Sequence, residues 1–148
     1  MALAIVEVDR RLPYAPAELA NLVSDVRAYP DFIPWVRKLD VLSETSVEGV
    51  RELIARAEIG WRAIHERFTS KVRVSGTRVD VALVDGPFKR MENTWRFEDD
   101  GKGGSIIRFR VAFEFKSALL QGVAMVNRGI VADRIIAAFD KEAKRRFG

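Results

Sequence analysis

Residues 118–147 read ALLQGVAMVNRGIVADRIIAAFDKEAKRRF, a proline-free stretch that is far longer than a β-strand. Its apolar and small side chains recur at steps of three and four residues, which is the spacing of one helix face. They are Met125, Gly129, Ala132, Ile136, Phe139 and Ala143. Charged residues such as Asp133 and Lys141 fall on the other side, and Ser117 is suited to cap the start. The sequence therefore predicts one long amphipathic helix.

Side chains between residues 36 and 116 alternate between apolar and polar with period two, as in β-strands. Turn signals such as Ser46-Val47-Glu48-Gly49 and Asp85-Gly86-Pro87 divide this region. The expected strands cover residues 36–46, 50–59, 62–74, 77–84, 88–98 and 105–116, with a further edge strand at 4–12. Short turns between consecutive strands predict a mostly antiparallel meander.

The segment between the first strand and this meander predicts a short helix followed by a plug. Pro16 suits the first helical position, and the apolar stripe of this helix ends near Arg27. Residues 29–35, Tyr-Pro-Asp-Phe-Ile-Pro-Trp, contain two prolines that prevent a long helix and three aromatic rings. We call residues 29–35 the plug. The pattern predicts an α+β fold over residues 1–148, a single domain in which a curved sheet wraps the C-terminal helix around an apolar cavity.

Composition limits the chemistry that the chain can perform. With no cysteine and one histidine, the sequence has no convincing parts for a zinc site or a Ser-His-Asp triad, so we predict no catalytic residue and no metal. The net charge of +4 is compatible with an anionic partner, but a solvated basic surface is the simpler explanation. The apolar run at residues 1–6 is too short to span a membrane, so any membrane contact is expected to be peripheral and the location cytoplasmic.

A few polar residues fall on apolar strand faces. Asn93 stands between Met91 and Trp95, so its amide either bonds neighbouring backbone or makes a polar contact inside the cavity. Glu66 and Ser70 point inward by strict alternation, and a register bulge that turns them outward is favoured over a ligand role. His65 is expected to face solvent.

Four stretches carry a family resemblance: the plug, residues 68–72, residues 83–97 with Asp-Gly-Pro-Phe and Trp-x-Phe, and the ending 138–148. Together they resemble the coenzyme Q-binding START-domain family of the polyketide cyclase and lipid-transport superfamily. The resemblance implies a helix-grip (START-like) fold, with a curved seven-stranded antiparallel sheet around the C-terminal helix and a lipid-sized tunnel between them. Gly129 departs from the bulky residue expected early in that helix, and its small size suggests either a wider tunnel or a looser helix.

The resemblance and the small residues on the helix face together predict which residues bind the ligand. The tunnel is expected to be lined by Leu53, Ala55, Ala57, Val81, Leu83, Met91, Asn93, Trp95, Phe109, Val111, Gly129, Ala132 and Ile136. The tunnel mouth is expected at Phe32, Ile33, Trp35, Leu119, Leu120 and Val123. Asn93 is the best candidate for a polar contact to a quinone oxygen.

The resemblance implies a binding protein for ubiquinone or a similar lipid that supports respiration as a chaperone or carrier. No cofactor is required. We expect peripheral contact with the inner face of the cytoplasmic membrane or with respiratory complexes. The alternative is a ribosome-associated toxin that blocks subunit joining. Cations on the outward strand faces would contact the ribosomal RNA: Arg67, Lys71, Arg73, Arg108 and Arg110. No DNA binding is predicted. An aromatic polyketide cyclase is the third reading, and it depends on Glu66 and Asp85 as an acid/base pair.

Overall fold

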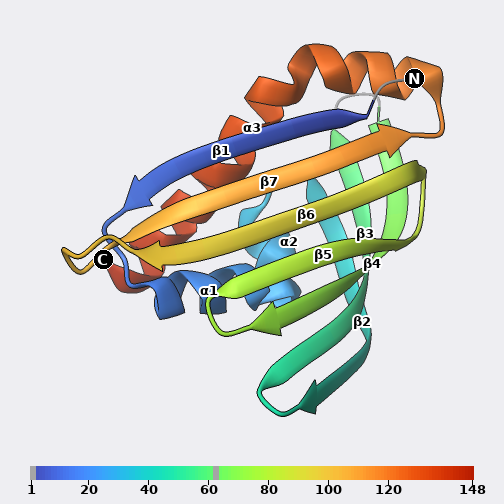
Figure 1. The fold of residues 1–148 in the computed structure, drawn as a ribbon. Helices are drawn as coiled ribbons and strands as arrows, with labels where there is room; N and C mark the ends of the chain where they lie inside the picture. The colour runs from blue at the N-terminus through green and yellow to red at the C-terminus, as the bar shows by residue number, and fades with distance from the viewer. Residues whose placement is uncertain (1–2, 62–63) are drawn as a thin grey trace.

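The computed structural model describes residues 3–61 and 64–148. Its seven-stranded antiparallel sheet has the strand order β1-β7-β6-β5-β4-β3-β2 (Figure 1). The strands are β1 (Ala4–Leu12), β2 (Val36–Val47), β3 (Val50–Trp61), β4 (Ile64–Ser75), β5 (Arg78–Asp85), β6 (Phe88–Asp99) and β7 (Ser105–Phe115). The helices are α1 (Pro16–Ser24), the 3-10 turn η1 (Val26–Ala28), α2 (Tyr29–Phe32) and α3 (Ala118–Phe147).

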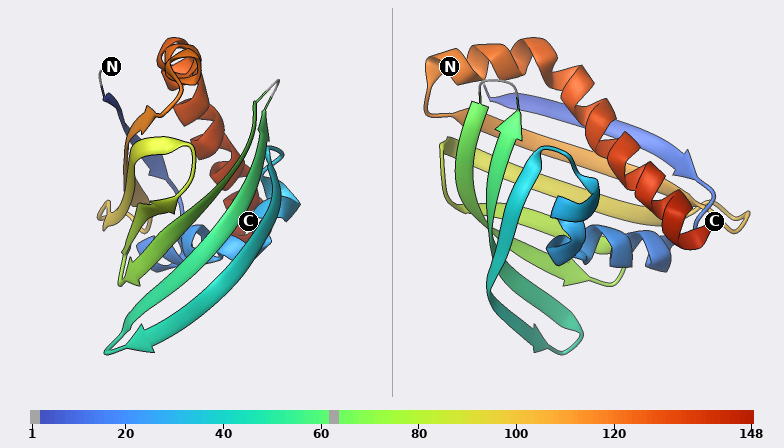
Figure 2. Two further views of the ribbon diagram at one scale, coloured as in Figure 1. Left: turned by 90° about the vertical axis from the view of Figure 1, so that its right-hand side faces the viewer. Right: turned by 180° about the vertical axis from the view of Figure 1, so that it is seen from behind.

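The predicted helix-grip fold is confirmed. Strands β2 to β7 follow one another as the predicted meander. Strand β1 lies at an edge of the sheet, as predicted for residues 4–12, and it pairs with β7. The sheet curls so that its two ends face each other across α3 (Figure 2). The strand expected from residue 62 is described from Ile64, because residues 62 and 63 lie outside the described residues.

Local chemistry explains the tight β2–β3 hairpin. Glu48 and Gly49 both have positive φ, at 52° and 80°, as a two-residue hairpin turn of the favoured hand requires. Gly49 adopts this conformation without steric cost, so the turn is shorter than the four-residue signal in the sequence.

Helix α3 begins and ends where the periodicity predicts, and its start is attached to the sheet. The Ser117 hydroxyl accepts a hydrogen bond from the Leu120 N–H at 3.2 Å, which confirms the predicted cap. The buried Gln121 Oε1 accepts from the Phe115 N–H at 2.8 Å and ties the first turn to the end of β7. None of the helices in the described ranges has both the length and the apolarity that spanning a membrane requires.

The second half of α3 packs into the main core, whereas the first half is largely exposed. Ala132, Ile136, Phe139 and Ala143 are buried there. The plug packs against the same region: the ring centroids of Tyr29 and Phe32 each lie 5.4 Å from that of Phe139 in edge-on contacts. The plug therefore anchors the C-terminal half of α3 and leaves the N-terminal half without comparable cover.

Candidate functional site: an apolar cavity beneath α3

A cavity of about 390 Å³ lies between the curved sheet and α3. This volume is within the range typical of sites for small molecules. Its walls come from strands across the whole sheet, from the plug and from one side of α3, and nearly all of them are apolar or aromatic. Small side chains at Ala55 and Ala57 of β3 leave the space open, because larger residues on this concave face would fill it.

Most of the predicted tunnel positions lie on this wall. They are Ala55, Ala57, Val81, Met91, Asn93, Trp95, Phe109, Val111 and Ala132. Of the predicted mouth residues, Ile33, Trp35 and Val123 also lie on it. Strand alternation explains this agreement, since residues two apart share a face and the inner face of a curled sheet surrounds the cavity. Whether these residues contact a ligand stays a prediction.

The structure places Gly129 and Ile136, two predicted tunnel residues, off the cavity wall. Each directly follows a wall residue, Arg128 or Ile135, and so lies about 100° further around the helix. Ile136 turns into the buried core and Gly129 turns to solvent. A Cβ at Gly129 would meet nothing within 4 Å, so the missing side chain does not widen the cavity.

Two strand residues are also off the wall. Leu53 belongs to the core, with 1% of its surface exposed, and borders the second cavity beside η1 and the last turn of α3 rather than the cavity described above. Leu83 lies beyond Ala82, the last residue of β5 that pairs with β6, and next to a register shift between β4 and β5. Leu83 is half-buried and pairs with Ser70, so it keeps the inward face that alternation assigns to it, but it lies past Val81, the residue of β5 that lies on the cavity wall.

The remaining predicted mouth residues, Phe32, Leu119 and Leu120, do not lie on the cavity wall, for two reasons. The Phe32 ring is occupied by contacts with Tyr29 and Phe139 inside the plug. Leu119 is 77% exposed, and neither it nor Leu120 lies on the cavity wall. Both leucines belong to the first turn of α3, before the helix passes over the cavity.

Ser70 is a correction in the other direction. The expected register shift is present beside it, between Thr69 and Ser70, but the side chain still faces inward and is only 6% exposed. Ser70 therefore lies on the cavity wall, whereas Glu66 is half-buried off the wall. His65 is exposed, as predicted.

Sequence reasoning missed an aromatic group at one end of the cavity. Phe88 stacks on Phe115 with ring centroids 4.5 Å apart, and Phe68 meets Phe88 edge-on at 5.9 Å. All three lie on the wall. The available signal was the alternation of β7, which places Phe115 on the same face as Phe113 and Phe109.

Asn93 makes two internal hydrogen bonds. Its Nδ2 donates to the Arg110 carbonyl at 2.9 Å, and its Oδ1 accepts from the Trp95 indole N–H at 2.8 Å. Tyr29 is satisfied in the same way, because its hydroxyl donates to the Val23 carbonyl, and burial raises the pKa of Tyr29. The main role of these hydrogen bonds is to fix the positions of the side chains that form the cavity wall.

Replacing Asn93 by leucine is expected to lower the free energy of unfolding by about 1–3 kcal/mol, because the Trp95 indole N–H and the Arg110 carbonyl lose their partner. Urea denaturation measures this change. Unaltered stability combined with weaker ligand binding would contradict the structural role and restore Asn93 as a ligand contact.

The charged groups on the wall are Arg128 and Arg134, both on α3 and both exposed at the entrance. Among the described wall residues there is no carboxylate and no imidazole. Asp85 is exposed off the wall and Glu66 is also off it, so the two groups needed for an acid/base mechanism do not meet in the cavity. The arrangement is suited to holding an apolar molecule with an acceptor group at the entrance.

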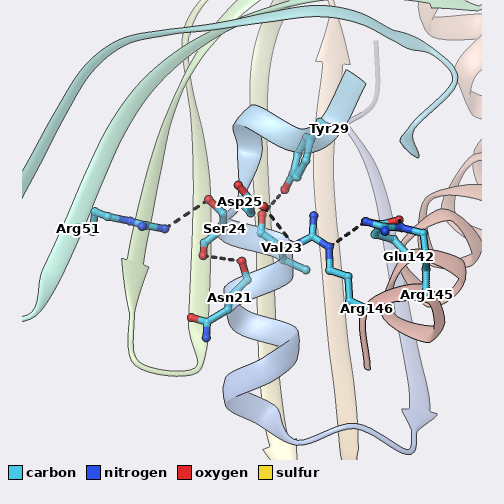
Figure 3. Close-up of polar contacts among 9 residues, drawn as sticks. All are labelled: Asn21, Val23, Ser24, Asp25, Tyr29, Arg51, Glu142, Arg145 and Arg146. Atoms are coloured by element: carbon cyan, nitrogen blue, oxygen red, sulfur yellow. Dashed lines mark hydrogen bonds and ion pairs between the residues drawn. The ribbon is translucent and has the colours of Figure 1, made fainter. Parts of the chain in front are cut away.

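A second, polar cavity of about 330 Å³ lies beside α1 and η1 and is bordered by Arg27, Arg51 and Arg146. Figure 3 shows the polar contacts of Arg51 and Arg146. All three arginines have carboxylate partners within the chain, Arg51 through Glu44 at 3.9 Å. Arg27 pairs with Glu44 at 2.9 Å, and Arg146 pairs with Asp25 at 3.1 Å and Glu142 at 2.8 Å. We therefore interpret the cluster as an ion-pair network that joins α3 to α1.

Comparisons with known proteins agree with this geometry. The pattern of the family described as "Polyketide cyclase / dehydrase and lipid transport" matches residues 12–140. An 18 kDa protein from Caulobacter crescentus of known structure is 35% identical, with a TM-score of 0.79 over 98% of this chain and 97% of that one. The ZhuI aromatase/cyclase from Streptomyces has a TM-score of 0.81 at 18% identity, which shows a shared fold alone.

Curated relatives carry two kinds of name. The chain is 30% identical to the ribosome association toxin RatA of Rickettsia prowazekii over 138 residues, which is 90% of this chain and 91% of that protein. It is 33% identical to the mitochondrial coenzyme Q-binding protein COQ10 of Drosophila melanogaster over 140 residues, which is 91% of this chain and 56% of that protein. Fold, cavity and sequence similarity lead to one conclusion: the chain belongs to the polyketide cyclase/dehydrase and lipid-transport family.

Proposed function

We propose that the protein binds an isoprenoid quinone such as ubiquinone in the cavity beneath α3 and carries or chaperones it for respiratory electron transport at the cytoplasmic face of a membrane. The observation that carries this proposal is the cavity itself, which is apolar and opens beside α3. The similarity to a coenzyme Q-binding protein supports the choice of ligand. The role needs no cofactor.

The quinone tail is proposed to lie along the apolar wall, from Ala55 and Ala57 to Val111. A quinone oxygen accepts hydrogen bonds but donates none, so its ring needs donors at the wall. Asn93 Nδ2 donates one of its two N–H groups to the Arg110 carbonyl. Arg128 likewise donates to the Met125 carbonyl at 2.6 Å and has further N–H groups, and Ser70 has an O–H on the wall. The second Asn93 N–H, the Ser70 hydroxyl and the remaining Arg128 N–H groups are the donors proposed for this contact.

Extraction of lipid from the purified protein, followed by mass spectrometry, tests the proposal. A quinone should be recovered in stoichiometric amount. Added ubiquinone should also quench the intrinsic fluorescence strongly, because all three tryptophans of the chain, Trp35, Trp61 and Trp95, lie on the cavity wall. Absence of bound lipid together with unchanged fluorescence would overturn the assignment.

The second candidate function is association with the ribosome, which the similarity to RatA along nearly the whole of both chains favours. The charge pattern lends it less support than the sequence predicts. Arg67 pairs with Glu58 at 3.0 Å, Arg108 with Asp9 and Glu98 at 2.9 Å each, and Arg110 with Glu7 at 3.6 Å. Lys71 and Arg73 remain on the exposed face of β4 without an ion pair within the described residues.

Sedimentation with ribosomal subunits through sucrose separates the two functions. RNA binding through a few cations should weaken steeply between low and moderate salt. Specific association that survives moderate salt, with growth arrest on overexpression, would favour the toxin role over the quinone carrier.

A further inference from the structure

The first half of α3 has two apolar sides. One side lies on the cavity wall and includes Ala124 and Val131. The other side carries Leu119, Val123, Val126 and Ile130, which are 77%, 37%, 84% and 50% exposed. Their spacing of four, three and four residues places them on one stripe of the helix. We call these four residues the α3 outer face.

The carboxylates near the α3 outer face are paired within the chain. No aspartate or glutamate occurs between Phe115 and Ala132, and the nearest ones, Glu114 and Asp133, pair with Lys89 at 3.7 Å and with Arg10 at 2.8 Å. Lys116 precedes the stripe and adds a cation at its start. The Lys116 N–H donates to the Pro87 carbonyl at 2.8 Å, so the start of β6, with Lys89 and Arg90, lies at the same end of the molecule. An apolar stripe with a cationic rim is complementary to a surface that is apolar beneath and negatively charged outside.

The outer face is continuous with the cavity entrance. Val123 belongs to the stripe and also to the cavity wall, and Arg128 and Val131 are exposed wall residues in the same turns. In Figure 2 this half of α3 runs along the open end of the curled sheet. A surface that covers the stripe would therefore lie against the entrance.

We propose that the α3 outer face docks on an anionic lipid bilayer and places the cavity entrance at the membrane surface. This inference deepens the proposed function, because a quinone carrier must exchange its ligand with a membrane. A second copy of the chain is a poorer occupant. A two-fold symmetric contact through this stripe would bring the same cationic rims together without a facing carboxylate between Phe115 and Ala132.

Co-sedimentation with vesicles tests the docking. The wild-type protein should bind phosphatidylcholine vesicles that contain phosphatidylglycerol, bind pure phosphatidylcholine weakly, and release as salt rises. Changing Leu119→Gln and Val126→Gln together should weaken binding about tenfold, since two exposed apolar side chains no longer enter the bilayer. Lys116→Gln should weaken binding to phosphatidylglycerol vesicles several-fold, about one cation's worth.

Val47→Gln is the matched control, because Val47 is 67% exposed at the end of β2, away from α3, and should bind vesicles as the wild type does. Wild-type vesicle binding by the Leu119/Val126 variant would overturn the proposal. So would a wild-type dimer in light scattering that this variant converts to monomer, because a second copy would then be the occupant.

Quinone titration in detergent micelles separates the two proposals. The Leu119/Val126 variant should keep wild-type quinone affinity in detergent and lose transfer of quinone from vesicles. If wild-type protein binds no quinone in detergent but shows the vesicle pattern above, the docking surface stands and the assigned ligand falls.

Discussion

Val81→Trp is expected to weaken quinone binding about a hundredfold and leave the fold intact. Val81 lies on β5 with its side chain on the cavity wall, so an indole at this position occupies space that the ligand needs. Losing about 100 Å² of buried ligand contact removes about 2.5 kcal/mol, which corresponds to roughly that factor. Overpacking normally destabilises a core, but here the added volume enters an existing cavity.

Val84→Trp on the same strand is the control for this substitution. Val84 is 54% exposed and does not line the cavity, so it adds the same indole without blocking it. Isothermal titration with a short-tailed ubiquinone and thermal unfolding should be measured on both proteins. Equal affinities in the two variants would mean that the ligand does not occupy the cavity beneath α3.

Glu142→Gln is expected to cause the largest loss of stability, about 1–3 kcal/mol at neutral pH. The Glu142 side chain is 6% exposed and receives hydrogen bonds from Arg145 at 2.8 and 2.6 Å and from Arg146 at 2.8 Å (Figure 3). The bonds from Arg145 and then from Arg146 lower the pKa of Glu142 from 4.5 to about 2. Losing charge-assisted hydrogen bonds to a buried carboxylate accounts for the stated free energy, and the melting temperature should fall by about 2–12 °C.

The pH dependence identifies the cause of this loss. Between the pKa of about 2 in the folded chain and 4.5 in the unfolded chain, the unfolded state binds more protons at Glu142. The stabilisation is therefore complete above the unfolded pKa and is lost as pH falls toward the folded one. The difference between wild type and Glu142→Gln should shrink over this window in urea titrations. A difference that stays constant down to low pH would assign the loss to packing and contradict the charge argument.

Glu98→Gln provides a matched control for the charge. Glu98 also bonds an arginine, Arg108 at 2.9 Å, but both side chains are nearly half exposed. Exposed pairs contribute less than about 1 kcal/mol, because water already solvates both charges. The contrast should separate a buried carboxylate that holds two arginines from a surface ion pair.

Local periodicity was sufficient to predict the elements of this protein. Helix α3 begins at Ala118 and ends at Phe147, as its spacing of apolar residues indicates. Residues three and four apart share one face of a helix, so a buried helix face can be recognised from the sequence alone. Alternation placed Ala55, Ala57 and Trp95 on the concave face for the same reason. The motifs of the plug and of residues 83–97 led to the family.

Long-range geometry decided what the chemistry of the cavity is. The first half of α3 is apolar on two sides, so its periodicity cannot tell which side meets the cavity, and Gly129, predicted to line it, is exposed and off the wall. The register between β6 and β7 brings the Arg110 carbonyl to Asn93. The Asn93 amide, which was predicted to contact the ligand, therefore donates a hydrogen bond to the backbone. Spacing along the chain specifies which residues share a face, but only the packing of distant elements specifies what that face meets, because such contacts join residues as far apart as Asp25 and Arg146.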